Sequence, residues 1–171
     1  MGLAIVSGAA WGTSLRFAAN FCGRWGLVSS ARQLISELCA TYLEPNERSA
    51  ALVMAVQELV ENLAKYSLGS ASFEFELGLR DGEPEARICT HNLAAEESLA
   101  QVGQLLECIV TSAEPVALYD EWVASSGERD GSRLGLIRLR AEAGLTLSYS
   151  IDATGLTLAV SGPVEPIATV S

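Results

Sequence analysis

Two stretches of the chain alternate apolar and polar residues with a period of two, and each predicts an antiparallel hairpin. In SASFEFELGLRDGEPEARICTHN, Phe73 and Phe75 alternate with Glu74 and Glu76 before DGEP turns the chain. Near the C-terminus, LTLSYSID and TGLTLAVSG form the second pair, joined through DATG. A weaker alternation over residues 13–21, TSLRFAANF, predicts a first strand.

Between these strands, apolar residues recur at helical spacing. Serine hydroxyls suit the start of one helix, and Pro45 separates it from the next. The glycine-bearing segment GERDGSRLG, residues 127–135, predicts a loop ahead of a last, short helix. The expected helices run from Ser29 or Ser30 to Tyr42, from Asn46 to Ser67, on either side of Pro115 within residues 93–127, and over residues 134–144.

This order of elements predicts the α+β class. The expected architecture is a two-layer α/β sandwich, in which helices cover one face of a mixed, largely antiparallel sheet. The 171 residues suit one domain rather than two. We therefore expect a single domain over residues 1–171, with an ordered core at about 13–161 and a frayed tail over 162–171.

The composition narrows the classes of partner. Apolar residues make up 49% of the chain and charged residues 19%, which is typical of a folded domain rather than a disordered one. The formal net charge of -10 argues against nucleic acid and anionic membranes, because both attract Lys and Arg. Protein or small-molecule partners fit this composition better.

The cysteines and the N-terminus indicate a cytoplasmic protein. The four cysteines are widely spaced and form no CxxC pair, so four free thiols in a reducing compartment fit better than two disulfides or a metal site. The N-terminal MGLAIVSGAAWG lacks the basic region of a signal peptide, and no apolar run reaches membrane-spanning length.

The helix predicted from Asn46 to Ser67 carries the first candidate site. Glu58 and Asn62 lie together at one flank of its apolar face, whereas Glu61 and Lys65 point further outward as an i,i+4 pair. In phosphoryl transfer, Asn62 could ligate Mg²⁺ and Glu58 could accept a proton. Spacing alone favours an ordinary helix surface, because Glu and Asn four residues apart are common.

The second candidate is the segment DGSRLGLIRL. A glycine-bearing loop that enters a helix N-terminus presents free backbone N–H groups to an anion such as phosphate. Two glycines, Gly131 and Gly135, are a weak signal by themselves, and a plain loop is the more frequent outcome.

In this order the two segments resemble the GHKL ATPase superfamily. ELVENLAKYS is similar to the E-x-x-x-N box of histidine kinases and anti-sigma-factor serine kinases, and GSRLGLI is similar to the G-x-G-L-G-L box. The layout resembles the SiaB-like branch of bacterial regulators, in which a strand-borne T-x-N, here residues 90–92, precedes two helices, the LGL box and a final hairpin. The resemblance covers about residues 15–160.

The resemblance implies a Bergerat-type pocket for ATP and Mg²⁺, with Glu58 as the general base and Asn62 as the Mg²⁺ ligand. The superfamily's D-x-G-x-G box is absent, because Cys-Thr-His-Asn stands at residues 89–92, and Arg133 replaces an expected glycine. A side chain there would crowd a phosphate, although a guanidinium could also contact one. The implied cofactor-binding residues are Asn62, Lys65, Asn92, Gly131, Arg133, Leu134 and Gly135.

Three functions follow from these observations. The favoured one is a bacterial signalling regulator of GHKL-like fold, which binds a small antagonist, STAS-like or SiaC-like protein in a partner-switching system and has degenerate or lost ATP binding. The missing Asp box and Arg133 favour it. The alternative, an active Mg-ATP-dependent serine/threonine kinase of such a partner, is favoured by Glu58 with Asn62. The third is an α+β scaffold unrelated to nucleotides. The resemblance also suggests a homodimer.

Overall fold

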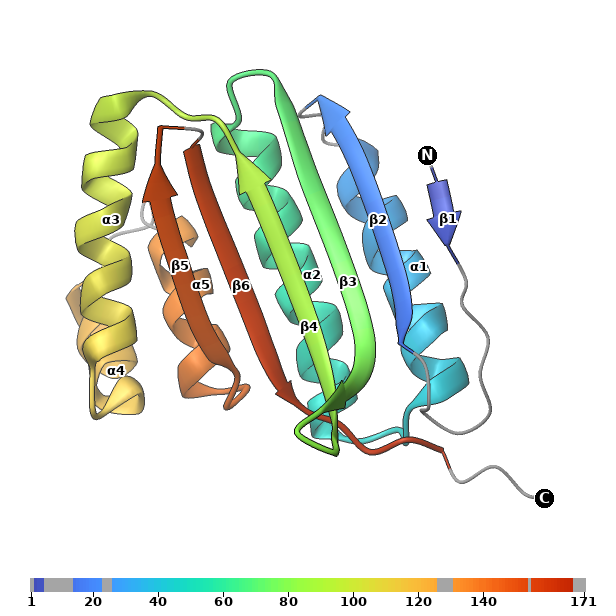
Figure 1. The fold of residues 1–171 in the computed structure, drawn as a ribbon. Helices are drawn as coiled ribbons and strands as arrows, with labels where there is room; N and C mark the ends of the chain where they lie inside the picture. The colour runs from blue at the N-terminus through green and yellow to red at the C-terminus, as the bar shows by residue number, and fades with distance from the viewer. Residues whose placement is uncertain (1, 5–13, 23–25, 126–130, 154, 168–171) are drawn as a thin grey trace.

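The computed structural model describes residues 2–4, 14–22, 26–125, 131–153 and 155–167. Over these residues the chain forms a six-stranded sheet with the strand order β1-β2-β3-β4-β6-β5 (Figure 1). The predicted α+β sandwich is confirmed, with a sheet that is antiparallel at each described pair rather than mixed. The strands are β1 (Gly2–Ala4), β2 (Leu15–Cys22), β3 (Ser70–Arg80), β4 (Glu83–Asn92), β5 (Thr146–Asp152) and β6 (Gly155–Pro163).

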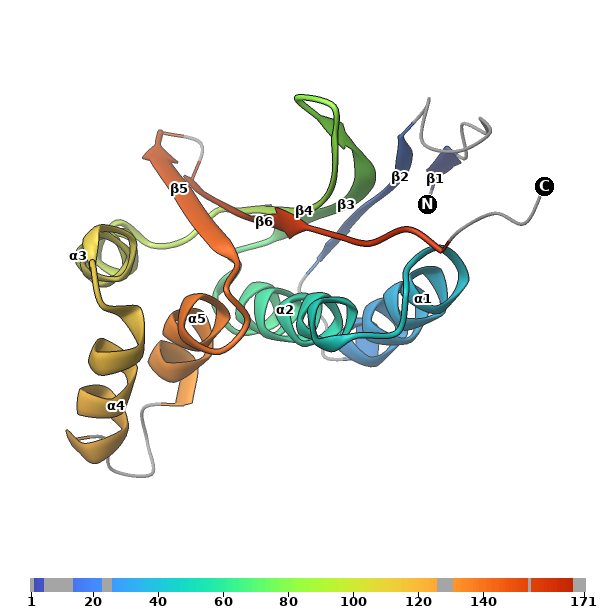
Figure 2. The same cartoon turned by 90° about the horizontal axis from the view of Figure 1, so that it is seen from below.

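The helices gather on one side of this sheet. Figure 2 shows α1, α2 and α5 side by side under one face, with α3 beside the edge strand β5 and α4 next to α5. The other face of the sheet carries no helix in the described part of the chain. The helices are α1 (Gly26–Tyr42), α2 (Glu47–Tyr66), α3 (Glu96–Thr111), α4 (Pro115–Ser125) and α5 (Gly131–Ala141).

Both predicted hairpins are confirmed. Phe73 and Phe75 of β3 are buried in the core beneath the helices, while the half-buried Glu74 and Glu76 alternate with them. A two-residue turn leads into β4, and β5 and β6 form the second hairpin. Strand β6 also pairs with β4, so the second hairpin extends the sheet that the first one begins.

Helix α2 runs through the centre of the core. It begins with a capping box, in which Ser49 N donates to Asn46 Oδ1 at 3.0 Å and Asn46 N donates to Ser49 Oγ at 3.1 Å. The predicted limits of this helix, Asn46 and Ser67, are therefore its N-cap and C-cap. Complete burial of one large aliphatic side chain stabilises a fold by about 1.5–3 kcal/mol. The buried large aliphatic residues of α2 are Leu52, Val56, Leu59, Val60 and Leu63.

The predicted starts of two helices are wrong. Helix α1 begins at Gly26, so Ser29 and Ser30 lie inside it rather than at its cap. Helix α5 begins at Gly131, so the segment expected to be a loop is helical from Gly131 onward, and residues 127–130 lie outside the described part. A glycine costs a helix only about 1 kcal/mol. Burial of Leu136, Ile137 and Leu139 outweighs that cost.

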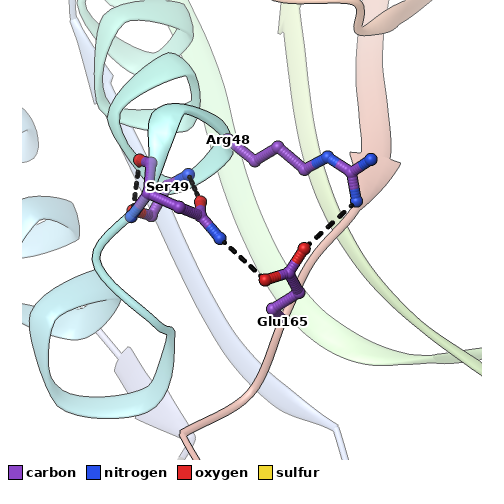
Figure 3. A network of polar contacts seen from close by, with 4 residues as sticks. Arg48, Ser49 and Glu165 are labelled. Atoms are coloured by element: carbon purple, nitrogen blue, oxygen red, sulfur yellow. Dashed lines mark hydrogen bonds and ion pairs between the residues drawn. The ribbon is translucent and has the colours of Figure 1, made fainter.

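The tail predicted to fray from residue 162 is instead bound to the domain as far as residue 167. Val164 is buried and its N–H donates to Pro84 O at 3.1 Å. Figure 3 shows Glu165 beside the start of α2, where it accepts from Asn46 Nδ2 at 3.1 Å and pairs with Arg48 at 3.6 Å. The pattern missed this because the segment pairs with residues more than 75 positions earlier rather than with its neighbours.

Candidate functional site

A cavity of about 580 Å³ opens between α2, α3 and the ends of β4 and β6. Helix α5 contributes Leu136 to its lining, and β6 contributes Leu156 and Leu158. A volume of this order is typical of small-molecule sites, which span roughly 300–1000 Å³. The cavity is therefore the candidate binding site of this fold.

Two polar side chains of β4 are buried where the sheet meets the cavity. Thr90 is 2% exposed and Asn92 is 6% exposed. Asn92 Nδ2 donates to Leu93 O at 3.3 Å, which leaves one amide N–H and the Oδ1 acceptor of its side chain available. No hydrogen bond joins the Thr90 hydroxyl to a described residue, and its oxygen is not among the described buried side-chain atoms that lack a partner. These groups form the most deeply buried polar part of the lining.

Helix α2 forms the second wall of the cavity. Leu59, Asn62, Leu63 and Tyr66 follow one another at i, i+3, i+4 and i+7, which places all four on one face of the helix. Asn62 is half-buried among these apolar neighbours. The structure thus brings together two residues that the sequence singled out on separate elements, Asn62 on α2 and Asn92 on β4.

Helix α3 supplies the third wall, which the sequence interpretation missed. Val102 and Leu105 face the cavity together with Ser98, Gln101 and Gln104. The three polar residues are exposed. Polar residues at this spacing are typical of the solvent-facing side of any amphipathic helix. Nothing in their spacing distinguishes a cavity wall from such a face.

The described lining carries no formal charge. Its apolar part consists of leucine, valine and alanine, and its polar part of serine, threonine, tyrosine, asparagine and glutamine. Lys65, assigned to the cofactor by resemblance, is not among these residues, and its Nζ lies 3.7 Å from Glu61 Oε2. The predicted i,i+4 pair is confirmed. A role of Lys65 in binding phosphate stays a prediction.

Glu58 lies between α2 and α5 rather than in the described lining of the cavity. A Cβ atom added at Gly135 would lie 2.0 Å from Glu58 Oε2, so the carboxylate rests directly against the backbone of α5. Burial raises the pKa of Glu58, and Glu61 raises it further, against smaller opposing effects of Lys65 and Arg138. A raised pKa suits a general base, but it arises here at a helix–helix contact.

The other residues of the predicted phosphate box belong to the first turns of α5. Gly131 and Arg133 lie in its first turn, and Leu134 is half-buried in the next. Leu136 reaches the cavity, whereas Leu134 and Gly135 are not among its described lining. The roles assigned to these residues remain predictions of the sequence resemblance.

A close backbone contact fixes the end of β4 at the cavity. Gly155 begins β6 with a φ of 127°, and a Cβ there would lie 2.1 Å from the carbonyl oxygen of Asn92. Only glycine combines that φ with that approach. The contact holds the start of β6 against the residue whose carboxamide lines the cavity.

Outside the cavity, the described residues were searched for metal-binding clusters, disulfides and membrane-spanning helices. They contain no cluster of three or more His, Cys, Asp or Glu arranged to hold a metal ion. Cys39, Cys89 and Cys108 are free thiols. Among the described helices none is long and apolar enough to cross a membrane.

The arrangement defines the class of fold: an antiparallel sheet with helices on one face and a cavity between α2, α3 and the sheet. No family model and no curated protein sequence matches the chain. Among solved structures, the chain resembles one chain of the SiaB–SiaC complex from Pseudomonas aeruginosa, with a TM-score of 0.61 and 14% identity over 86% of this chain and 89% of that one. At this identity the likeness establishes a shared fold.

Proposed function

We propose that this protein is a bacterial signalling regulator that works by binding a small protein partner, in the manner of a partner-switching system, and that it has lost productive ATP binding. The observation that carries the proposal is the uncharged lining of the cavity. This cavity lies between the α2 segment that resembles the E-x-x-x-N box and the T-x-N segment of β4, yet its described lining offers no cation for a phosphate chain.

The sequence supports the same conclusion. The D-x-G-x-G box of the resembled superfamily is absent from β4, where Thr90 and Asn92 line the cavity instead. Arg133 stands where the resembled motif has a glycine. The general base would be Glu58, but its carboxylate packs against Gly135. Three separate elements, β4, α5 and α2, thus depart from what binding of ATP or transfer of its phosphate would require.

The class of partner follows from the likeness to a chain crystallised in a two-protein complex. We infer that this chain recognises a small regulatory protein of the SiaC-like, STAS-like or antagonist type. A net charge of -10 suits a partner with a basic surface.

The test starts from a tagged full-length chain expressed in its own host. A small protein that copurifies with it is then produced separately and titrated into the purified chain by calorimetry. Saturable one-to-one binding without nucleotide supports the proposal. Absence of any heat with the purified candidates, or binding that requires Mg·ATP, contradicts it.

A second function has one observation in its favour. Asn62 lines the cavity one helical turn after Glu58, as expected for a serine/threonine kinase that holds Mg·ATP in this position. This hypothesis predicts transfer of the γ-phosphate of ATP to the purified partner and loss of transfer in Asn62→Ala. Mass spectrometry of the partner after incubation with Mg·ATP separates the two functions, because the regulator leaves its mass unchanged.

A further inference from the structure

Helix α4 is apolar around most of its circumference, yet none of its residues is buried. Apart from Asp120, Glu121 and Ser125, its 11 residues are all aliphatic or aromatic. A helix of this kind is normally buried in a core or against another surface. Within the described chain α4 packs chiefly on α5, and Figure 2 shows it projecting away from the sheet. The missing burial points to a partner outside this chain.

Only one side of α4 packs against the domain. Leu118, Tyr119 and Trp122 lie on that side, and all three are half-buried against the core. On the opposite side Val116 is 54% exposed and Val123 is 47% exposed, and their i,i+7 spacing places them on one stripe. The outer face of α4 consists of Val116, Ala117, Asp120, Val123 and Ala124, all exposed. A contiguous apolar face of this kind marks an interaction surface.

The charges on and around the outer face define the chemistry of its partner. At 3.6 residues per turn, Asp120 lies between Val116 and Val123, near the middle of the face. The charged residues of the segment 113–125 are Glu114, Asp120 and Glu121, which are all acidic and exposed. A complementary partner therefore presents apolar side chains with Lys or Arg among them.

A second copy of this chain fits the outer face poorly. Because Asp120 lies near the middle of the face, a twofold contact would bring two Asp120 carboxylates together, and like charges across an interface are costly. An anionic membrane would repel a chain of net charge -10. A helix of 11 residues is about 16 Å long and about 10 Å wide, so its outer face is smaller than the roughly 800 Å² per partner of a stable interface. The face suits a transient contact with a different protein.

We propose that the outer face of α4 binds an amphipathic helix of a protein partner. The apolar stripe of that helix packs on Val116 and Val123, and a Lys or Arg beside the stripe pairs with Asp120. Helices pack on one another along stripes of this spacing. The inference rests on the proposed function, because it assigns the surface with which the regulator recognises its small protein partner, away from the cavity.

Two synthetic peptides test the chemistry of this face on the full chain. Each is an amphipathic helix of about 18 residues, a length at which isolated helices form in water, and one combines leucine with lysine, the other leucine with glutamate. Fluorescence anisotropy of the labelled peptides should show saturable binding of the lysine peptide and at least tenfold weaker binding of the glutamate peptide. No saturable binding of the lysine peptide, or equal affinity for both peptides, overturns the inference.

Variants of exposed residues locate the bound peptide. The double variant Val116→Ser, Val123→Ser keeps every charge, so an expected loss of at least tenfold in affinity for the lysine peptide reports the apolar contact rather than general attraction to an acidic chain. Asp120→Lys should weaken the lysine peptide and strengthen the glutamate peptide. Leu79→Ser is the control, because Leu79 is 51% exposed on β3, and this variant should bind within twofold of the native chain. Unchanged affinity in the double variant, or an equal loss in the control, contradicts the assigned face.

Titration of the purified small partner into the native chain and into the double variant separates this inference from the proposed function. A double variant that loses both the lysine peptide and the partner supports both. A partner that binds the two chains equally overturns the inference and leaves the proposed function in place. Binding of the lysine peptide to this face in a chain that recognises no small partner removes the proposed function alone.

Discussion

The carboxylate of Glu58 occupies the space that a side chain at Gly135 would fill, because a Cβ atom there would lie 2.0 Å from Glu58 Oε2. The acid of the E-x-x-x-N segment and a glycine of the LGL segment are thus partners in packing α2 against α5. The two resembled motifs meet at a structural contact, and the cavity lies beside it.

The effect of Gly135→Ala on the melting temperature should have opposite signs with glutamate and with alanine at position 58. In the native background the new methyl must displace the Glu58 carboxylate, and the melting temperature should fall. In a Glu58→Ala background that obstacle is absent, so the better helix propensity of alanine, about 1 kcal/mol, should raise the melting temperature by about 2–4 °C. Calorimetry of the four variants measures the coupling. Equal effects of Gly135→Ala in both backgrounds would mean that the two residues are independent.

Glu58→Gln should raise stability at neutral pH. Burial and Glu61 raise the pKa of Glu58 in the folded state, so the folded chain binds a proton there more tightly than the unfolded chain does. Proton binding by Glu58 therefore adds to the free energy of unfolding. This contribution is complete below the ordinary carboxyl pKa of 4.5, and it is lost as the pH rises through the higher pKa of the folded state. Chemical denaturation of both chains should therefore agree at about pH 4 and diverge toward pH 8, with the Gln variant more stable. A Gln variant less stable at pH 8 would indicate that the ionised carboxylate stabilises the fold.

Arg140 should stabilise the fold by binding the C-terminal end of α3. Its Nη1 on α5 donates to the carbonyl oxygens of Ile109, Val110 and Ser112, which lie where helix carbonyls lack partners. Arg140→Met keeps much of the apolar volume and removes these bonds, so the free energy of unfolding should fall by about 1.5–3 kcal/mol. Arg138→Met is the control, because Arg138 forms an exposed ion pair with Glu142 on the same helix, and its loss should cost under about 1 kcal/mol. Equal losses in the two variants would contradict the assigned role.

The thiols should react in an order set by their environment. Cys108 is exposed, Cys89 is half-buried on β4, and Cys39 is buried, which raises the pKa of its thiol to about 11. Because the thiolate is the reactive form, Cys39 should stay unmodified in the native chain while Cys108 is modified first. Mass spectrometry after timed alkylation and digestion measures this order. Modification of Cys39 at the rate of Cys108 would show that the α1 side of the core opens readily.

Elements with strong local signals were predictable from the sequence. The alternation of Phe73 and Phe75 with glutamates marks β3, and the Asn46 cap marks the start of α2. Strand β1 was not predictable, because three residues, Gly2–Ala4, are too few for a periodic pattern. The insertion of β6 between β4 and β5 is a long-range pairing, which local periodicity does not encode.

The candidate site was predictable only in part. Asn62 and Asn92 were found through the resemblance, and both line the cavity. Glu58 lies about 40° around the helix from Asn62, by the 3.6-residue repeat, and that rotation takes it from the cavity to the α5 contact. The membership of the chain in the GHKL superfamily, and every role of ATP and Mg²⁺, stay predictions of the sequence motifs.

Titration of the purified small partner into the chain, with and without Mg·ATP and followed by mass analysis of both proteins, tests directly whether the protein acts by binding its partner without ATP. We expect the same one-to-one affinity under both conditions and no phosphate on either protein. Partner binding that depends on Mg·ATP, or a partner that gains a phosphate in the native chain but not in Asn62→Ala, would contradict it.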